Sequence, residues 1–215
     1  MASNRWKSLA IGLGAAGSIA LPAYYLLVRR WHARWGATDE EVARNMPGDD
    51  LVEDPWDVST RAITMRATTA DIWPWLLQMG YRRGGLYSND WIDKVMGVLD
   101  EPSSWEILPE FQHLEAGDVI PIGGGPDWPV KSIEPHKSIV LDIRDEGVNI
   151  SWSIGLYELD EEYTRFVLRI RIRMTPLMHA LSFIPISDFG QFLMVRWMLL
   201  GIKARAEMLA AHRET

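Results

Sequence analysis

The longest apolar stretch of the chain runs from Leu9 to Val28 and contains no charged residue. As a helix it would rise about 1.5 Å per residue and be about 30 Å long, which matches the hydrocarbon core of a bilayer. Basic residues flank it on both sides: Arg5, Lys7, Arg29, Arg30 and Arg34. The pattern predicts a single-pass membrane protein, with a transmembrane helix over 9–28 inside an anchor that comprises residues 1–35.

Three other interpretations of this stretch are open. A cleaved signal peptide would end at small residues, but here Tyr24–Val28 leads into basic residues. Gly12–Gly17 matches G-x-G-x-x-G, and Asp39 is spaced like a ribose-binding acid, yet residues 29–38 are basic, Trp-rich and not strand-like. The third is a buried core helix.

The anchor carries two further signals. Ala10, Gly14 and Ser18 share one helical stripe, which would allow weak self-association of the anchor. The slight excess of arginine after the stretch favours a domain on the cytoplasmic side.

After the anchor, residues 36–57 are rich in acids and read as an acidic linker. The β-branched residues of Val58–Arg66 predict a strand. Thr68 and Asp71 have capping-box spacing, which predicts a helix that contains Pro74 and ends near Gly80.

Strict alternation of apolar and polar residues predicts three antiparallel strands over 138–144, 149–159 and 164–174. The last strand carries arginines on the face opposite its apolar residues: Arg165, Arg169, Arg171 and Arg173. We interpret this row as a solvated face paired with acids such as Asp142, rather than as a site for an anionic ligand.

The chain closes with a predicted helix from Asp188 to His212, whose apolar residues cover more than one face. This excess indicates a ligand cavity, a partner or lipid beside the helix. The preceding Pro176–Ile186 is also apolar and reads as a hydrophobic lid, a second contact with the bilayer, or loosely packed core.

The middle third, residues 81–122, is aromatic and rich in turns. In it, Gly84 and Gly85 precede Tyr87, Asp90 and Trp91. The glycines would let backbone approach a ligand, or would form a tight turn that leads into a core helix.

The order of strand, helix, aromatic insertion, antiparallel strands and final helix resembles the SRPBCC superfamily, which includes START domains and polyketide cyclases. The resemblance rests on residues 61–80 and on the final helix around 201–207, and it covers residues 58–213. It implies an α+β helix-grip fold, with a curved antiparallel sheet wrapped around the C-terminal helix and an apolar cavity between them. It implies no single activity.

Composition excludes several classes of function. The 215-residue chain lacks cysteine, which excludes thiolate nucleophiles and cysteine-bound zinc. Beyond residue 35, 17 basic residues face 29 acidic ones, and a surface that acidic is a poor partner for nucleic acid. The five histidines are scattered, so we expect no metal and no cofactor.

The leading hypothesis is a membrane-tethered domain that binds a hydrophobic or amphiphilic, lipid-like small molecule, with the bilayer as its second partner. Its candidate lining residues are mainly aromatic: Trp75, Tyr87, Trp91, Trp105, Trp152, Leu168, Ile170, Phe192, Met194 and Trp197. One alternative is a cyclase- or hydrolase-type enzyme that uses Asp90 with Tyr87 or His113. Another is a structural protein that docks a membrane partner.

Overall fold

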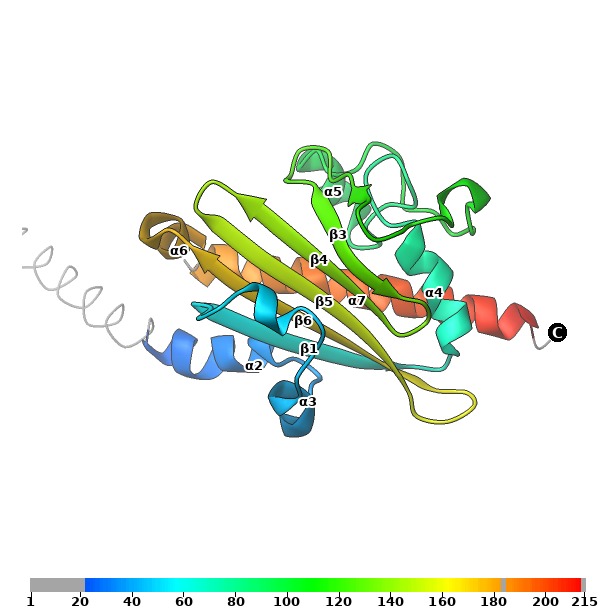
Figure 1. Ribbon diagram of the computed structural model, residues 1–215, viewed down its shortest axis with the longest axis horizontal. Helices are drawn as coiled ribbons and strands as arrows, with labels where there is room; N and C mark the ends of the chain where they lie inside the picture. Colours follow the sequence, from blue (N-terminus) through cyan, green and yellow to red (C-terminus); the bar gives the residue numbers. More distant parts are fainter. Residues whose placement is uncertain (1–21, 183–184, 214–215) are drawn as a thin grey trace, which may run out of the picture.

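The computed structural model describes residues 22–182 and 185–213. Six strands form one antiparallel sheet in the order β1-β6-β5-β4-β3-β2, and the long helix α7 runs along one face of it (Figure 1). The strands are β1 (Asp57–Met65), β2 (Val119–Ile120), β3 (Trp128–Glu134), β4 (Ser138–Asp145), β5 (Val148–Glu158) and β6 (Thr164–Met174). The longer helices are α4 (Thr69–Leu77), α5 (Asp90–Val95), α6 (Pro176–Ser182) and α7 (Pro185–Arg213). Short helices complete the list: η1 (Tyr24–Val28), α2 (Arg29–Ala33), α3 (Asp39–Ala43), η2 (Asp49–Leu51) and η3 (Pro109–Phe111).

The α+β class, the antiparallel sheet and the long C-terminal helix are confirmed. The three alternating segments form β4, β5 and β6, and the predicted final helix is α7. The Thr68–Asp71 capping box is present at the start of α4, although this helix ends at Leu77, before Gly80. Alternation works here because one face of each strand packs toward α7 while the other does not.

The sequence did not predict β2 and β3. β3 contains Pro129 and is largely exposed, so it lacks the alternation that marked the other strands. Its pairing with β4 shifts register between Val130 and Ser132, which leaves this side of the sheet irregular.

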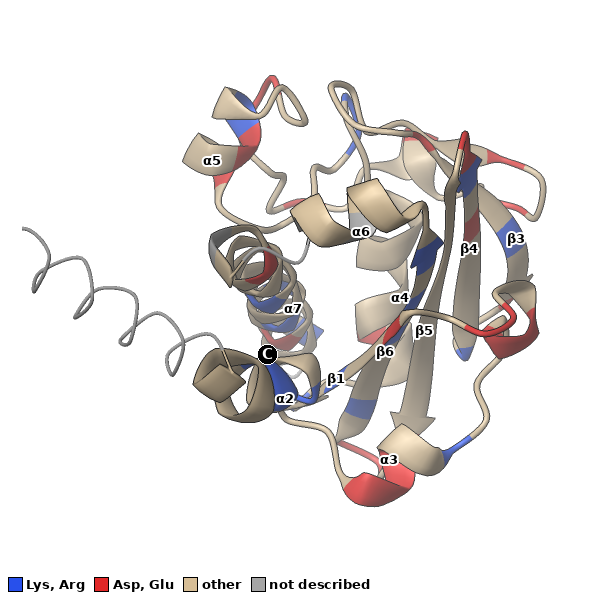
Figure 2. Cartoon of the chain, turned by 90° about the vertical axis from the view of Figure 1, so that its left-hand side faces the viewer, with Lys and Arg blue, Asp and Glu red and all other residues tan. Residues whose placement is uncertain are grey.

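The face of the sheet that is turned away from α7 is covered by the segment expected to be a linker. In this segment α3 lies against β6, and it is held there by acids (Figure 2). Glu41 accepts hydrogen bonds from Arg165 at 2.6 and 2.8 Å, and Asp49 accepts one from Arg169 at 2.7 Å. In the structure, residues 36–57 therefore pack on the sheet through their acidic side chains.

This packing corrects the interpretation of the arginine row as a solvated face. Arg169 is only 3% exposed and donates to the carbonyl oxygens of Glu41, Val42 and Arg44 at 2.6 to 2.9 Å. Asp142 bonds Arg144 instead of a residue of the row. Acids do neutralise the row, but they come from a segment more than a hundred residues earlier in the sequence.

Residues 9–21 of the predicted transmembrane helix lie outside the described residues. Between 22 and 182 and between 185 and 213, no helix combines the length and the apolar character needed to cross a bilayer. The described end of the stretch is η1, a single π-helical turn that continues directly into α2.

Replacing Arg169 with methionine should lower the free energy of unfolding by about 3 to 5 kcal/mol, because the carbonyls and the Asp49 carboxylate that it bonds would lose their donor. Urea unfolding of the full chain in mild detergent measures this. Arg173→Met, on the same face but exposed, is the matched control and should change stability by less than about 1 kcal/mol. Equal losses in the two variants would contradict the structural role of Arg169.

The Glu41 carboxylate should contribute stability in a pH-dependent way. Hydrogen bonds from Arg165 hold its pKa below the ordinary value of 4.5. Its contribution is therefore complete above that value and is lost as the pH falls through the lower folded-state pKa. We expect the stability difference between wild type and Glu41→Gln to be constant down to about pH 5 and to shrink at lower pH. Glu146→Gln, in the exposed β4–β5 turn, should show no such trend.

Candidate functional site

An apolar cavity lies between the sheet and α7. It is enclosed almost wholly by apolar atoms and has a volume of about 10 Å³, roughly the room for one water molecule. Its walls come from α4 and the turn after it, four strands and α7: Leu76, Met79, Ile120, Trp128, Ile139, Leu141, Trp152, Ile154 and Met198. The region is therefore a packed core with a small void, and it is far smaller than a lipid-sized chamber.

One residue in the wall of this cavity, Trp152, carries a polar atom without a hydrogen-bond partner. The indole Nε1 of Trp152 is buried and makes no hydrogen bond. The Trp152 ring stands edge-on to Trp128, with 4.3 Å between their centroids. A buried donor without an acceptor costs free energy, so an acceptor placed beside it would be favoured.

Of the residues predicted to line a cavity, Trp152 lines this one. Trp75, Tyr87 and Leu168 lie in the core, with Ile170 at its margin. On α7, Met194 and Trp197 are half-buried.

The other three predicted lining residues lie away from the cavity. Trp91 is 75% and Trp105 is 54% exposed, so both are surface residues. Trp105 stacks on Arg205, whose guanidinium carbon is 4.1 Å from the ring centroid. Phe192 is buried against α2, with its ring 5.1 Å from that of His32.

The candidate catalytic residues are not assembled into one group. The Tyr87 hydroxyl donates to the carbonyl of Trp75 at 3.0 Å, and burial raises the pKa of this phenol. Asp90 accepts from the hydroxyl of Ser103 at 2.7 Å. His113 is exposed elsewhere. No hydrogen bond joins any two of Asp90, Tyr87 and His113, all of which the structure describes.

The aromatic insertion is fastened to α7 at a point of close approach. Tyr87 has a positive φ of 59°, and a Cβ added to Gly201 would lie 1.9 Å from the Tyr87 carbonyl oxygen. Arg205 donates to the carbonyls of Ser103 and Ser104 at 3.1 and 2.6 Å. Gly84 and Gly85 thus belong to a packed turn, where Gly85 adopts a positive φ beside Ser103.

A second hollow of about 280 Å³ lies open beside η3. It is lined by residues of mixed charge: Arg83, Glu110, Phe111, His113, Leu114, Asp118 and Val119. Arg83 lies over the Phe111 ring and donates to the carbonyl of Leu77 at 2.8 Å, and burial lowers its pKa. Of the candidate catalytic residues, only His113 is found there.

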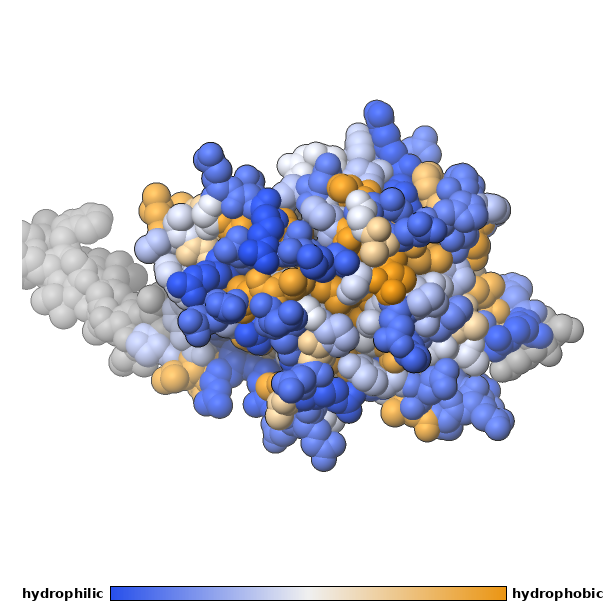
Figure 3. Space-filling model, viewed as in Figure 1, coloured by the Kyte–Doolittle hydropathy of each residue, from blue (hydrophilic) through white to orange (hydrophobic). Residues whose placement is uncertain are grey.

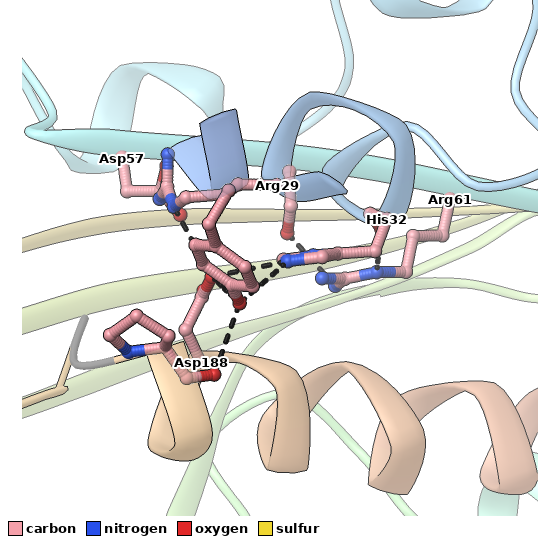
Figure 4. Close-up of polar contacts among 8 residues, drawn as sticks. Arg29, His32, Asp57, Arg61 and Asp188 are labelled. Carbon is pink, nitrogen blue, oxygen red and sulfur yellow. Dashed lines mark hydrogen bonds and ion pairs between the residues drawn. The ribbon is translucent and has the colours of Figure 1, made fainter. Parts of the chain in front are cut away.

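A polar cluster with His32, Arg61 and Asp188 buried at its centre joins the N-terminal helices to the start of α7 (Figure 4). Asp188 accepts from the Tyr24 hydroxyl at 2.8 Å and lies 3.1 Å from Nε2 of His32. Arg29 pairs with Asp57 on β1, and Arg61 donates to the carbonyl of His32 at 2.9 Å. We call these residues the junction cluster.

The junction cluster has an unusual electrostatic setting. Burial lowers the pKa of Arg61 to about 10. Burial acts to raise the pKa of Asp188, but hydrogen bonds from His32 and Tyr24 outweigh it, so the net pKa is below the ordinary value. Sequence reasoning missed this cluster because Tyr24 and Asp188 are 164 residues apart. In the sequence, the one local sign of these two residues is that each is a polar group at the end of an apolar stretch.

Comparison with known proteins adds little to this geometry. No protein-family model matches the chain, and no curated protein matches its sequence. Similar solved structures include a conserved protein from Geobacillus kaustophilus, at 15% identity over 70% of this chain and 95% of that chain, with a TM-score of 0.41. Truncated norcoclaurine synthase from Thalictrum flavum is 13% identical over 68% and 91%, with a TM-score of 0.42. The Aha1 dimer from Colwellia psychrerythraea is 16% identical over 71% and 97%, with a TM-score of 0.37. With identities and TM-scores this low, these likenesses carry no argument about activity.

Replacing Asp188 with asparagine should loosen the junction. The amide keeps the shape but loses the negative charge that pairs with Arg29, so we expect a loss of about 1 to 3 kcal/mol in the free energy of unfolding. The local loosening can be measured by amide hydrogen exchange, which should accelerate in α2 more than in β4. Asp142→Asn, which alters a pair with the exposed Arg144, is the control, and an equal effect in both variants would contradict the prediction.

Proposed function

We propose that the chain is a membrane-tethered binding protein for a small apolar molecule that carries one hydrogen-bond acceptor. The ligand would lie between the sheet and α7, with its acceptor beside the indole of Trp152. The tether would be residues 9–28, whose uncharged sequence has the length of a bilayer core.

The observation that carries the proposal is that Trp152, which forms part of the wall of an apolar cavity, has a buried indole N–H without a partner. Ligand sites commonly combine apolar walls with a few polar groups that fix orientation. An acceptor at this position would satisfy the buried donor, whereas an alkane would leave it unsatisfied.

The volume of about 10 Å³ means that a ligand must displace side chains. Met79 and Met198 are the wall residues best suited to this, since methionine is unbranched and repacks at low cost. The site therefore favours a compact molecule over a long-chain lipid.

The test compares a short-chain 2-ketone with the alkane of equal length, titrated into the full chain in detergent micelles. The advantage of the ketone over the alkane should fall about three- to tenfold in Trp152→Phe, the worth of one neutral hydrogen bond. Comparing the difference between variants cancels the unequal partition of the two probes into micelles.

Trp91→Phe removes an exposed indole and is the matched control that should keep the wild-type ratio. In nitrogen-edited NMR spectra, the Trp152 indole N–H signal should move with the ketone and not with the alkane. An unchanged ratio in Trp152→Phe, or no movement of that signal, would refute the proposal.

A further inference from the structure

Exposed apolar side chains gather where the N-terminal helices meet α6 and α7. We call this surface the end face. It comprises eight residues: Leu26, Leu27, Val28, Trp31, Leu177, Met178, Leu181 and Phe189. Apolar residues are visible at this end of the space-filling view (Figure 3).

The two halves of the end face are held side by side. The Tyr24 hydroxyl donates to the Pro185 carbonyl at 3.1 Å and to Asp188 at 2.8 Å. Trp31 stands edge-on to Phe192, with 5.4 Å between their centroids. Figures 1 and 2 show η1, α2 and α6 at the same end of the molecule. The arrangement is therefore fixed by direct contacts.

The residues of the end face are all uncharged. Residues 175–187 contain no charged side chain, and the next acid, Asp188, is buried in the junction cluster. Arg30, which precedes Trp31 on α2, is exposed. Exposed acids lie beside the end face: Asp145 and Glu146 adjoin Gly147, whose carbonyl accepts from the Thr175 amide at 2.8 Å, so the absence of acids holds for the end-face residues alone.

The sequence that leads into the end face indicates what covers this surface. Leu26, Leu27 and Val28 are the last residues of the uncharged stretch from Leu9, and Tyr24, Tyr25 and Trp31 are of the type that anchors helices at a membrane interface. Since Tyr24 is bonded to the start of α7, insertion of residues 9–28 would bring α6 to the same bilayer surface.

We propose that the end face rests on the bilayer that holds the tether, with Leu177 and Leu181 of α6 in the boundary between headgroups and acyl chains. This rests on the tether in the proposed function and adds a second contact that fixes how the domain is oriented. An amphipathic helix that lies in the interface makes such a contact.

The absence of cysteine allows single-site labelling of the full chain. Leu177→Cys and Leu181→Cys would carry an environment-sensitive nitrobenzoxadiazole label in phosphatidylcholine–phosphatidylglycerol vesicles. Leu159→Cys is the matched control, because Leu159 and Leu181 are 58% and 57% exposed and the β5–β6 turn lies at the other end of the domain (Figure 1). We expect a blue shift and quenching by doxyl lipids at 177 and 181, and neither at 159.

Flotation tests the tether, and quenching of the labels tests the docked end face, so the two proposals can fail separately. Chains that float with vesicles while the labels at 177 and 181 stay unquenched would keep the tether and overturn the docked end face. Failure to float would overturn both. A blue shift that grows with protein concentration without lipid would show that a second copy covers the end face, which also overturns the proposal. Quenching at 177 and 181 that only equals the quenching at 159 would also overturn the docked end face.

Discussion

Burial of the Arg169 guanidinium on the outer face of the sheet requires that face to be covered. A buried cation needs acceptors for its donors, and this one finds them at the end of α3, where helix carbonyls have no intrahelical partner. At the other end of α3, Glu41 completes a capping box with Thr38 and also accepts from Arg165. A helix of only five residues is thus held at both ends by the arginine row, and the sheet gains its second layer.

The same constraint determines how the N-terminal region belongs to the domain. Residues after the apolar stretch are held first at the junction cluster and then by Arg165 and Arg169. Between these points, Arg165 also bonds the carbonyl of Gly36, and the Ala62 amide bonds that of Trp35. The path from η1 to η2 is therefore a structural layer of the domain, and its acids are structural ligands of arginine.

Elements that follow from the local spacing of apolar residues could be predicted from the sequence. Features that form where distant segments meet could not. Strands β4 to β6 and helix α7 follow from alternation and length, which a single sequence displays. The arginines alternate with apolar residues in the same way whether water or a distant acidic segment covers them. The burial of this row therefore could not be predicted from the sequence. Aromatic content likewise indicated an apolar interior, yet could not tell that Trp152 lines the cavity while Trp105 stacks on Arg205 at the surface.

Helix α7 connects the features on which the proposals depend. Asp188 near its start enters the junction cluster, Met198 forms a wall of the cavity, and Arg205 fastens the aromatic insertion. Because Gly201 lies against the Tyr87 backbone, the helix cannot slide there without a clash. A ligand that widens the cavity must therefore be accommodated by rotation of Met79 or Met198, or by tilting of α7 near its start, where the junction cluster and the aromatic contacts of α2 hold it. The cavity and the end face are thus mechanically joined by a single helix.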